Sequence, residues 1–195
     1  MSLNETKLDL LKDIELDENE AFPNLDLMSE GETRYLRDLR INLKNTLGSQ
    51  NLNLKEAYLI ASAIAANEGH KRLTNAFLNQ AKQNGANEAE IAETLACAST
   101  LAVNNVFYRF KHFMKDSNEI YQTMPAGIKM NVMMSPVLGK ELFELMSLAV
   151  SAVNGCESCV NSHEESVRKM GSSEARIFDA VRLASVIRGL CVALS

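Results

Sequence analysis

The feature that most constrains the fold of this chain is an internal repeat with an offset of about 86 residues. Each copy has the pattern of an apolar helix, a glycine turn, a second helix, and a Gly-x-x-Glu step into a third helix. The aligned pairs are Gly69 with Gly155, Gly85 with Gly171, Glu88 with Glu174, and Ile91 with Ile177. Amphipathic helical hairpins resemble one another in any case, so chance similarity is the alternative. A true repeat predicts two hairpins of similar shape.

Helical patterns cover most of the chain, and no segment shows sustained period-two alternation, which favours an all-α fold. Ser29 is predicted to cap a helix that runs to about Leu47 and ends at Gly48, after a short N-terminal helix and an acidic loop at 16–23. Further helices are expected at about 54–68, 70–83, 88–108, 111–122, 139–153, 156–170 and 174–194. We therefore predict a single domain over 1–195, with N-terminal helices in 1–53, a first repeat without paired cysteines in 54–109, and a second repeat with a C-x-x-C pair in 139–195.

Composition narrows the class of protein. The 195 residues include only three prolines and nine glycines, which favours helices, and the chain is long enough for one sizeable core. A net charge of −5 with scattered Lys and Arg argues against a nucleic-acid partner. The N-terminus lacks a secretory signal pattern, and no apolar run approaches the roughly 20 residues that span a bilayer. We expect a cytoplasmic protein with no membrane partner.

The pattern that carries chemistry is Cys156-x-x-Cys159-x₃-His163, at the predicted start of a helix. At about 100° per residue these three side chains fall within roughly 60° of one helical face, so the sulfurs can meet in a disulfide near an imidazole. Unpaired N–H groups and the positive end of the helix dipole favour thiolate at such a position. Oxidation of one thiolate by peroxide gives a sulfenic acid, which a second thiol converts to a disulfide.

Three interpretations of the cysteine pair are open. Structural zinc usually takes four Cys or His ligands, and this sequence has no second ligand pair near the first. Two buried core cysteines are a further alternative, although Glu157, Ser158, Asn161 and Ser162 suit an accessible helix start better than a core. The pattern therefore favours a redox-active dithiol without a bound metal or cofactor.

Glu144 is the predicted partner of His163. The Asn154-Gly155 turn makes the helices on either side antiparallel, so Glu144 comes opposite about residue 165, within one turn of His163. A glutamate on the solvated face of a helix is the alternative. A carboxylate–imidazole–thiol order of groups is suited to moving the thiol proton.

The run from Met130 to Gly171 closely resembles the alkyl hydroperoxide reductase D-type (AhpD) alkylhydroperoxidases of the carboxymuconolactone decarboxylase-like superfamily. The segments that carry this resemblance are Met130–Met133, Phe143–Leu145, Ala149–Cys156 and Cys159–His163, with Asn104–Arg109 as a second family segment. The Glu-x₁₁-Cys-x-x-Cys-x₃-His pattern is specific, whereas a bare C-x-x-C is not. By length and element order the resemblance covers nearly the whole chain.

The resemblance implies an all-helical fold, usually trimeric, with two related repeats. It also implies an antioxidant thiol peroxidase that reduces alkyl hydroperoxides, is re-reduced by dihydrolipoyl groups of 2-oxo acid dehydrogenase components, and can regenerate an AhpC-type peroxiredoxin. By the same resemblance Cys159 would become the sulfenic acid, and Cys156 would supply the proton and form the Cys156–Cys159 disulfide. Glu144 and His163 would form a proton relay. The well-known family form has histidine directly before the second cysteine, where this chain has Ser158.

Two other functions compete with this interpretation. One is a decarboxylase or lactone-cleaving enzyme of the same superfamily, although such chemistry does not need two thiols. The other is a redox-sensing module whose disulfide switches a partner interaction. Cys97 and Cys191 lie in apolar helical stretches that predict core packing, and His112 suits a surface or subunit contact. No glycine-rich nucleotide motif is present in the sequence, so we expect electrons to arrive by thiol exchange.

Overall fold

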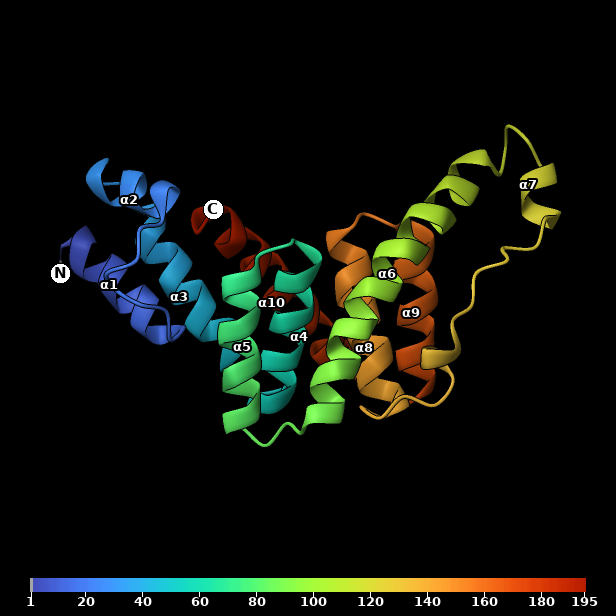
Figure 1. Ribbon diagram of the computed structural model, residues 1–195. Coiled ribbons are helices and arrows are strands. Elements are labelled where there is room, and N and C mark those ends of the chain that lie inside the picture. The colour runs from blue at the N-terminus through green and yellow to red at the C-terminus, as the bar shows by residue number, and fades with distance from the viewer. Residues whose placement is uncertain (1) are drawn as a thin grey trace.

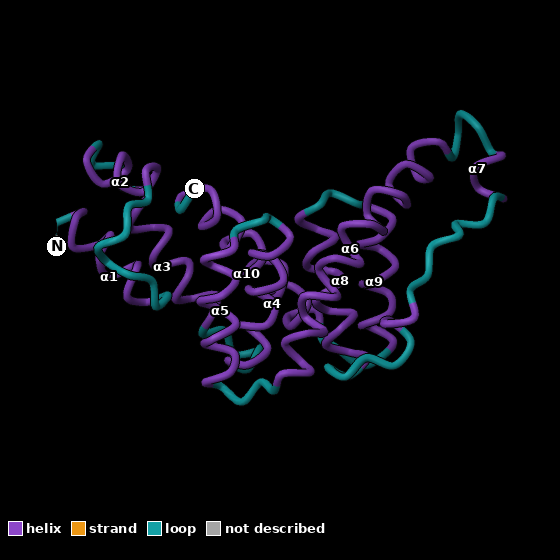
Figure 2. Tube along the Cα trace, viewed as in Figure 1, coloured by secondary structure: helices purple, strands orange, loops and turns teal. Residues whose placement is uncertain are grey.

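The computed structural model describes residues 2–195, which form helices joined by turns and contain no strand (Figures 1 and 2). The all-α prediction is therefore confirmed. The helices are α1 (Leu3–Asp13), α2 (Pro23–Glu30), α3 (Tyr35–Leu47), α4 (Leu54–Asn67), α5 (Lys71–Gln83), α6 (Glu88–Met114), α7 (Ile120–Thr123), the 3₁₀ turn η1 (Asn131–Met133), α8 (Lys140–Val153), α9 (Glu157–Lys169) and α10 (Glu174–Ala193).

Two sets of three helices begin at matching positions. The first residues of α4, α5 and α6 lie 86 residues before those of α8, α9 and α10 (54 to 140, 71 to 157, 88 to 174). Gly69 and Gly155 both adopt positive φ, 74° and 65°, in the turn that joins the first two helices of each set. Residues with a Cβ rarely adopt this left-handed conformation, so glycine at both positions sets the tight reversal of the chain.

The core is built around α4 and α8. Helix α4 contacts α5, α6, α8 and α10, and α8 contacts α4, α6, α9 and α10. Both are apolar on more than one face; Leu59 and Ile60 of α4 and Phe143 and Leu145 of α8 have no exposed surface. Burial of each such side chain contributes about 1.5–3 kcal/mol. The amphipathic helices α5 and α9 pack against this pair as the second arm of each hairpin (Figure 1).

The N-terminal helices differ from the sequence prediction at one point. Ser29 does not cap a helix running to Leu47, because it lies inside α2 (Pro23–Glu30) and a separate α3 begins at Tyr35. Pro23 occupies the first turn of α2, where its missing N–H costs nothing, so it begins a helix that the acidic loop pattern obscured. The break after α2 includes Gly31 and Glu32, which has a φ of 51°. The predicted helix end at Gly48 is correct.

A second correction concerns residues 88–122. The expected separate helices at 88–108 and 111–122 are one helix, α6, from Glu88 to Met114, followed by the short α7 at Ile120–Thr123. No glycine or proline interrupts the chain between 108 and 111, so the helix continues. Figure 1 shows the last turns of α6 and α7 extending away from the helices of the core.

The chain from α7 back to α8 is held against α6 by a buried carboxylate. Glu93 of α6 accepts hydrogen bonds from the backbone N–H groups of Val137 and Leu138, at 2.8 and 2.7 Å. Asn104, further along α6, donates through Nδ2 to the Met130 sulfur at 3.0 Å. These contacts keep the 124–139 segment over the second hairpin, where it covers one side of the site described below.

Candidate functional site

The start of α9 is fixed by the glycine turn that precedes it. The Cys156 N–H donates to the Ser151 carbonyl at 3.1 Å, and Cys156 is the N-cap residue of α9. The sulfurs of Cys156 and Cys159 lie 2.19 Å apart, at disulfide distance, with their Cα atoms 5.3 Å apart. The pair thus lies at the positive end of a 13-residue helix, where free N–H groups stabilise a thiolate.

The two sulfurs differ in their access to solvent. Cys156 has no exposed surface, whereas Cys159 is 8% exposed and lines a cavity. A reagent that enters from solvent therefore meets Cys159 first. Cys156 lies behind it, within bonding distance.

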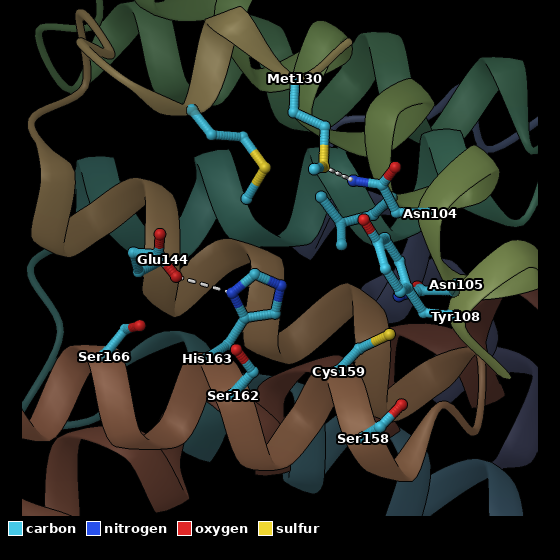
Figure 3. Close-up of a pocket in the computed structure, with 12 residues that line it drawn as sticks. Asn104, Asn105, Tyr108, Met130, Glu144, Ser158, Cys159, Ser162, His163 and Ser166 are labelled. Carbon is cyan, nitrogen blue, oxygen red and sulfur yellow. Dashed lines mark hydrogen bonds and ion pairs between the residues drawn. The ribbon is translucent and has the colours of Figure 1, made fainter. Parts of the chain in front are cut away.

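Glu144 and His163 face each other across the antiparallel helices α8 and α9, as expected from counting residues outward from the Asn154-Gly155 turn. His163 Nδ1 and Glu144 Oε2 are hydrogen-bonded at 2.6 Å, between α9 and α8 (Figure 3). Both residues are buried, so water competes weakly for this bond. A carboxylate oxygen that accepts a hydrogen bond from Nδ1–H leaves Nε2 of the same ring free to accept a proton. The catalytic role of the pair stays a prediction.

A cavity of about 480 Å³ lies between α6, α8, α9 and the 124–139 segment. Figure 3 shows its side chains converging on His163 and Cys159 from several elements. The lining residues are Leu101, Asn104, Asn105, Tyr108, Met130, Met133, Glu144, Ser158, Cys159, Ser162, His163 and Ser166. The space is large enough for a small organic molecule and opens directly on the accessible sulfur.

Three asparagines brace the turn that leads into the cysteines. Asn154 Nδ2 donates to the side-chain oxygens of Asn67 and Asn105, at 3.0 and 2.9 Å. Asn105 donates in turn to Ser151 at 2.9 Å, and Arg109 donates to the Asn154 carbonyl at 2.6 Å. The turn before Cys156 is thereby tied to α4, α6 and α8 at once, which fixes the first sulfur in place.

Sequence reasoning did not identify this network or the lining role of Asn104 and Met130. In the sequence Asn104 and Asn105 belong to the second family segment, and two asparagines in the middle of a long helix are themselves a signal. Asparagine is a poor helix former in such positions, so a pair of them suggests that the side chains have polar partners.

Ser158 lies at the rim of the site, in place of the family's histidine. Its hydroxyl is 3.7 Å from the Cys156 sulfur, and the residue lines the cavity. Close by, His112 of α6 lies 3.3 Å from the Glu157 carboxylate through Nε2. His163 is the one histidine among the residues that line the cavity.

The remaining cysteines lie in the core, as predicted. Burial raises the pKa of both the Cys97 and the Cys191 thiols to about 12, so each stays protonated near neutral pH. His70, at the position equivalent to Cys156, accepts a hydrogen bond from the Leu73 N–H at the start of α5. Within residues 2–195 no group of three or more His, Cys, Asp or Glu side chains is placed to hold a metal ion. No helix in that range is long and apolar enough to cross a membrane.

Comparison with known proteins gives three kinds of match. Residues 121–195 match the model of the carboxymuconolactone decarboxylase family. A protein named alkyl hydroperoxide reductase AhpD from Anaeromyxobacter dehalogenans is 40% identical over 170 residues, which is 87% of this chain and 90% of that protein. Proteins of the same name from Streptomyces avermitilis and Coxiella burnetii are 39% and 36% identical, over 85% and 80% of this chain and 92% and 88% of those proteins.

A solved structure of a candidate gamma-carboxymuconolactone decarboxylase subunit from Burkholderia xenovorans superposes with a TM-score of 0.67. The match covers 97% of this chain and 92% of that one at 14% sequence identity. At that identity the likeness concerns the fold alone, and it agrees with the family match.

Proposed function

This chain belongs to the AhpD-type proteins of the carboxymuconolactone decarboxylase-like superfamily, and we propose that it is a thiol peroxidase that reduces alkyl hydroperoxides through Cys156 and Cys159. The observation that carries the proposal is one cavity lined by the accessible Cys159, by His163 and by the hydrogen-bonded Glu144. Nucleophile, base and orienting carboxylate are the three groups that an activated thiol requires.

In the proposed reaction Cys159 attacks the terminal oxygen of the hydroperoxide as a thiolate. The S–O bond forms as the O–O bond breaks, the sulfur loses two electrons, and the alcohol leaves. Cys156 then displaces water from the sulfenic acid to give the Cys156–Cys159 disulfide, which their i, i+3 placement permits. His163 Nε2 accepts the thiol proton, and Glu144 stabilises the resulting imidazolium.

We propose that a dihydrolipoyl dithiol closes the cycle. One of its thiols attacks Cys159, the sulfur that lines the cavity, and its second thiol releases the protein dithiol as the lipoyl ring forms. The family resemblance supplies the identity of the donor and also suggests an AhpC-type peroxiredoxin as a further electron acceptor. The apolar cavity walls formed by Leu101, Met130 and Met133 suit the hydrocarbon chain of such a donor.

Steady turnover tests the proposal. Dihydrolipoamide and tert-butyl hydroperoxide should be consumed continuously by the protein, and an AhpC-type peroxiredoxin should be reduced in the same mixture. A redox sensor would instead be oxidised once and stop. Oxidation of the cysteine pair without repeated turnover would overturn the proposal. Cys191→Ala, which removes a thiol from the core, is the matched control and should keep full activity.

We also propose that the chain forms a homotrimer, as the resemblance implies. The outward part of α6 exposes apolar side chains, including Val103, Val106, Phe110 and Phe113, which a partner subunit would cover. Light scattering should then give three times the chain mass of 21.6 kDa. A monomer at micromolar concentration would contradict this assembly.

A further inference from the structure

One polar group that faces the cavity, the hydroxyl of Tyr108, has no role in the proposed reaction cycle. Tyr108 of α6 lines the cavity and is half-buried, with its ring edge-on to Phe107 at 5.4 Å between centroids. Its hydroxyl makes no hydrogen bond within the described part of the chain. A partly buried tyrosine hydroxyl normally has a partner, so a free one that faces a cavity is available to a bound molecule.

The other hydroxyls that line the cavity lie on a different side. Ser158, Ser162 and Ser166 belong to α9, the helix that carries Cys159 itself. Tyr108 reaches in from α6, and Figure 3 shows its ring above Cys159, on the opposite side of His163 from Glu144. The cavity therefore offers a proton acceptor on one side of the sulfur and a hydrogen-bond donor on the other.

The amide donors on the same stretch of α6 already have partners. Asn105 Nδ2 donates to Ser151 at 2.9 Å, and Asn104 Nδ2 donates to the Met130 sulfur at 3.0 Å. Tyr108 is thus the uncommitted O–H donor on this wall, among the residues that line the cavity.

We propose that the Tyr108 hydroxyl donates a hydrogen bond to the leaving oxygen of the hydroperoxide, so that Tyr108 is a catalytic residue of the oxidation step. This inference rests on the proposed peroxide reduction. A thiolate attacks the terminal oxygen in line with the O–O bond, so the leaving alkoxide develops on the side away from the Cys159 sulfur. A donor fixed on the facing wall stabilises that charge as it forms.

The step needs no additional reactant. The S–O bond forms, the O–O bond breaks, and two electrons pass from sulfur to the peroxide. The Cys159 thiol loses one proton and the leaving alkoxide gains one to become the alcohol. Tyr108 therefore has no net loss of its own proton in this step. Its contribution grows with the basicity of the leaving oxygen, because a more basic oxygen accepts a stronger hydrogen bond.

The test is the oxidation half-reaction of the reduced protein, followed by alkylation of the remaining thiols and mass spectrometry. Tyr108→Phe should slow oxidation by tert-butyl hydroperoxide about 10-fold or more, which is the usual effect of one hydrogen bond to a developing charge. The loss should be smaller with hydrogen peroxide and smallest with peracetic acid, whose leaving carboxylate is weakly basic. Tyr121→Phe removes the same hydroxyl from a tyrosine that packs on Phe110, outside the cavity, and should change none of these rates.

The reduction half-reaction and the pH profile separate catalysis from structure. In Tyr108→Phe the disulfide should still be reduced by dihydrolipoamide at close to the normal rate, and the pH dependence of oxidation should keep its midpoint. An equal loss with all three oxidants, or a shifted midpoint, would overturn the inference, because it would mean that Tyr108 acts on the thiol rather than on the leaving group. A wild-type protein that no hydroperoxide oxidises would refute the proposed function and this inference together.

Discussion

In the α4–α5 hairpin, Tyr58 contacts Phe77 with ring centroids 6.2 Å apart. In the α8–α9 hairpin, the residues 86 positions later are Glu144 and His163, which are joined by a 2.6 Å hydrogen bond. The same two places on the same backbone arrangement therefore hold an aromatic contact in one hairpin and a carboxylate–imidazole pair in the other. The glycine turns therefore determine the shape of each hairpin, and the side chains at equivalent positions determine its chemistry.

The two hairpins also differ in how their outer helices are covered. The segment before α2 lies against α5, where Arg72 pairs with Glu20 at 2.9 Å and stacks 5.6 Å from the centre of the Phe22 ring. Leu73 and Phe77 of α5 have no exposed surface. Over α9 the 124–139 segment leaves a cavity of about 480 Å³. A reactive group is useful only in the second arrangement, because a small molecule can reach it.

The largest expected effect comes from giving the second hairpin the first hairpin's residue at the accessible sulfur. Cys159→Leu places leucine where α5 has Leu73, so the fold should persist. Without the proposed nucleophile, peroxide turnover should fall by at least about 10³-fold. Peroxide turnover measures the expected loss of activity, and circular dichroism measures whether the helical fold persists. Activity within tenfold of normal would show that the chemistry does not depend on Cys159.

The next effect concerns the pair that replaces Tyr58 and Phe77. A positioned acid or base typically contributes about 10²–10⁴-fold, so Glu144→Gln and His163→Ala should each slow turnover with dihydrolipoamide by at least roughly tenfold. The helical content should not change, which circular dichroism checks. Normal rates in folded variants would mean that the helix terminus alone activates the thiol, and the difference between the hairpins would then lie in the cysteines only.

Much of this comparison could be predicted from sequence because its determinants are local. The spacing of Cys156, Cys159 and His163 depends on helix geometry, and the Asn154-Gly155 turn fixed the count that placed Glu144 near His163. The asparagine network and the contact of Asn104 with Met130 join segments far apart in the chain, so no spacing rule reveals them. Ser29 and the helix at 111–122 were misassigned because local start and stop signals were ambiguous there.

Phe77 provides the reciprocal test in the first hairpin. Phe77→Ala removes a fully buried ring and should lower the free energy of unfolding by about 3–5 kcal/mol, because a cavity remains. Turnover by the fraction that stays folded should be unchanged, since α5 does not line the site. Urea unfolding followed by circular dichroism measures the first effect, and activity below the transition measures the second. If the Phe77→Ala protein kept its stability but lost its activity, packing in the first hairpin would influence the site in the second.

The smallest expected effect concerns an ion pair found at equivalent positions of the two repeats, with the positive and negative residues exchanged. Lys55 pairs with Glu90 at 2.8 Å, and the equivalent positions hold Glu141 and Arg176, paired at 2.9 Å. Arg176 also contacts Glu56 at 2.8 Å, so it bridges two carboxylates whereas Lys55 meets one. Arg176→Ala should lower stability by about 1–2 kcal/mol and Lys55→Ala by less than about 1 kcal/mol, since partly exposed pairs are screened by solvent.

The pH dependence distinguishes lost charge pairing from lost packing in Arg176→Ala. The hydrogen bond from Arg176 is the main reason that the pKa of the Glu141 carboxyl is lowered from its ordinary value of 4.5. A carboxyl with a lowered pKa stabilises the fold above its unfolded pKa, and this stabilisation is lost as the pH falls through the folded pKa. The gap in unfolding free energy between the wild type and Arg176→Ala should therefore narrow as the pH falls below about 4.5. A gap that stays constant down to acid pH would mean that the arginine acts by packing its aliphatic stem.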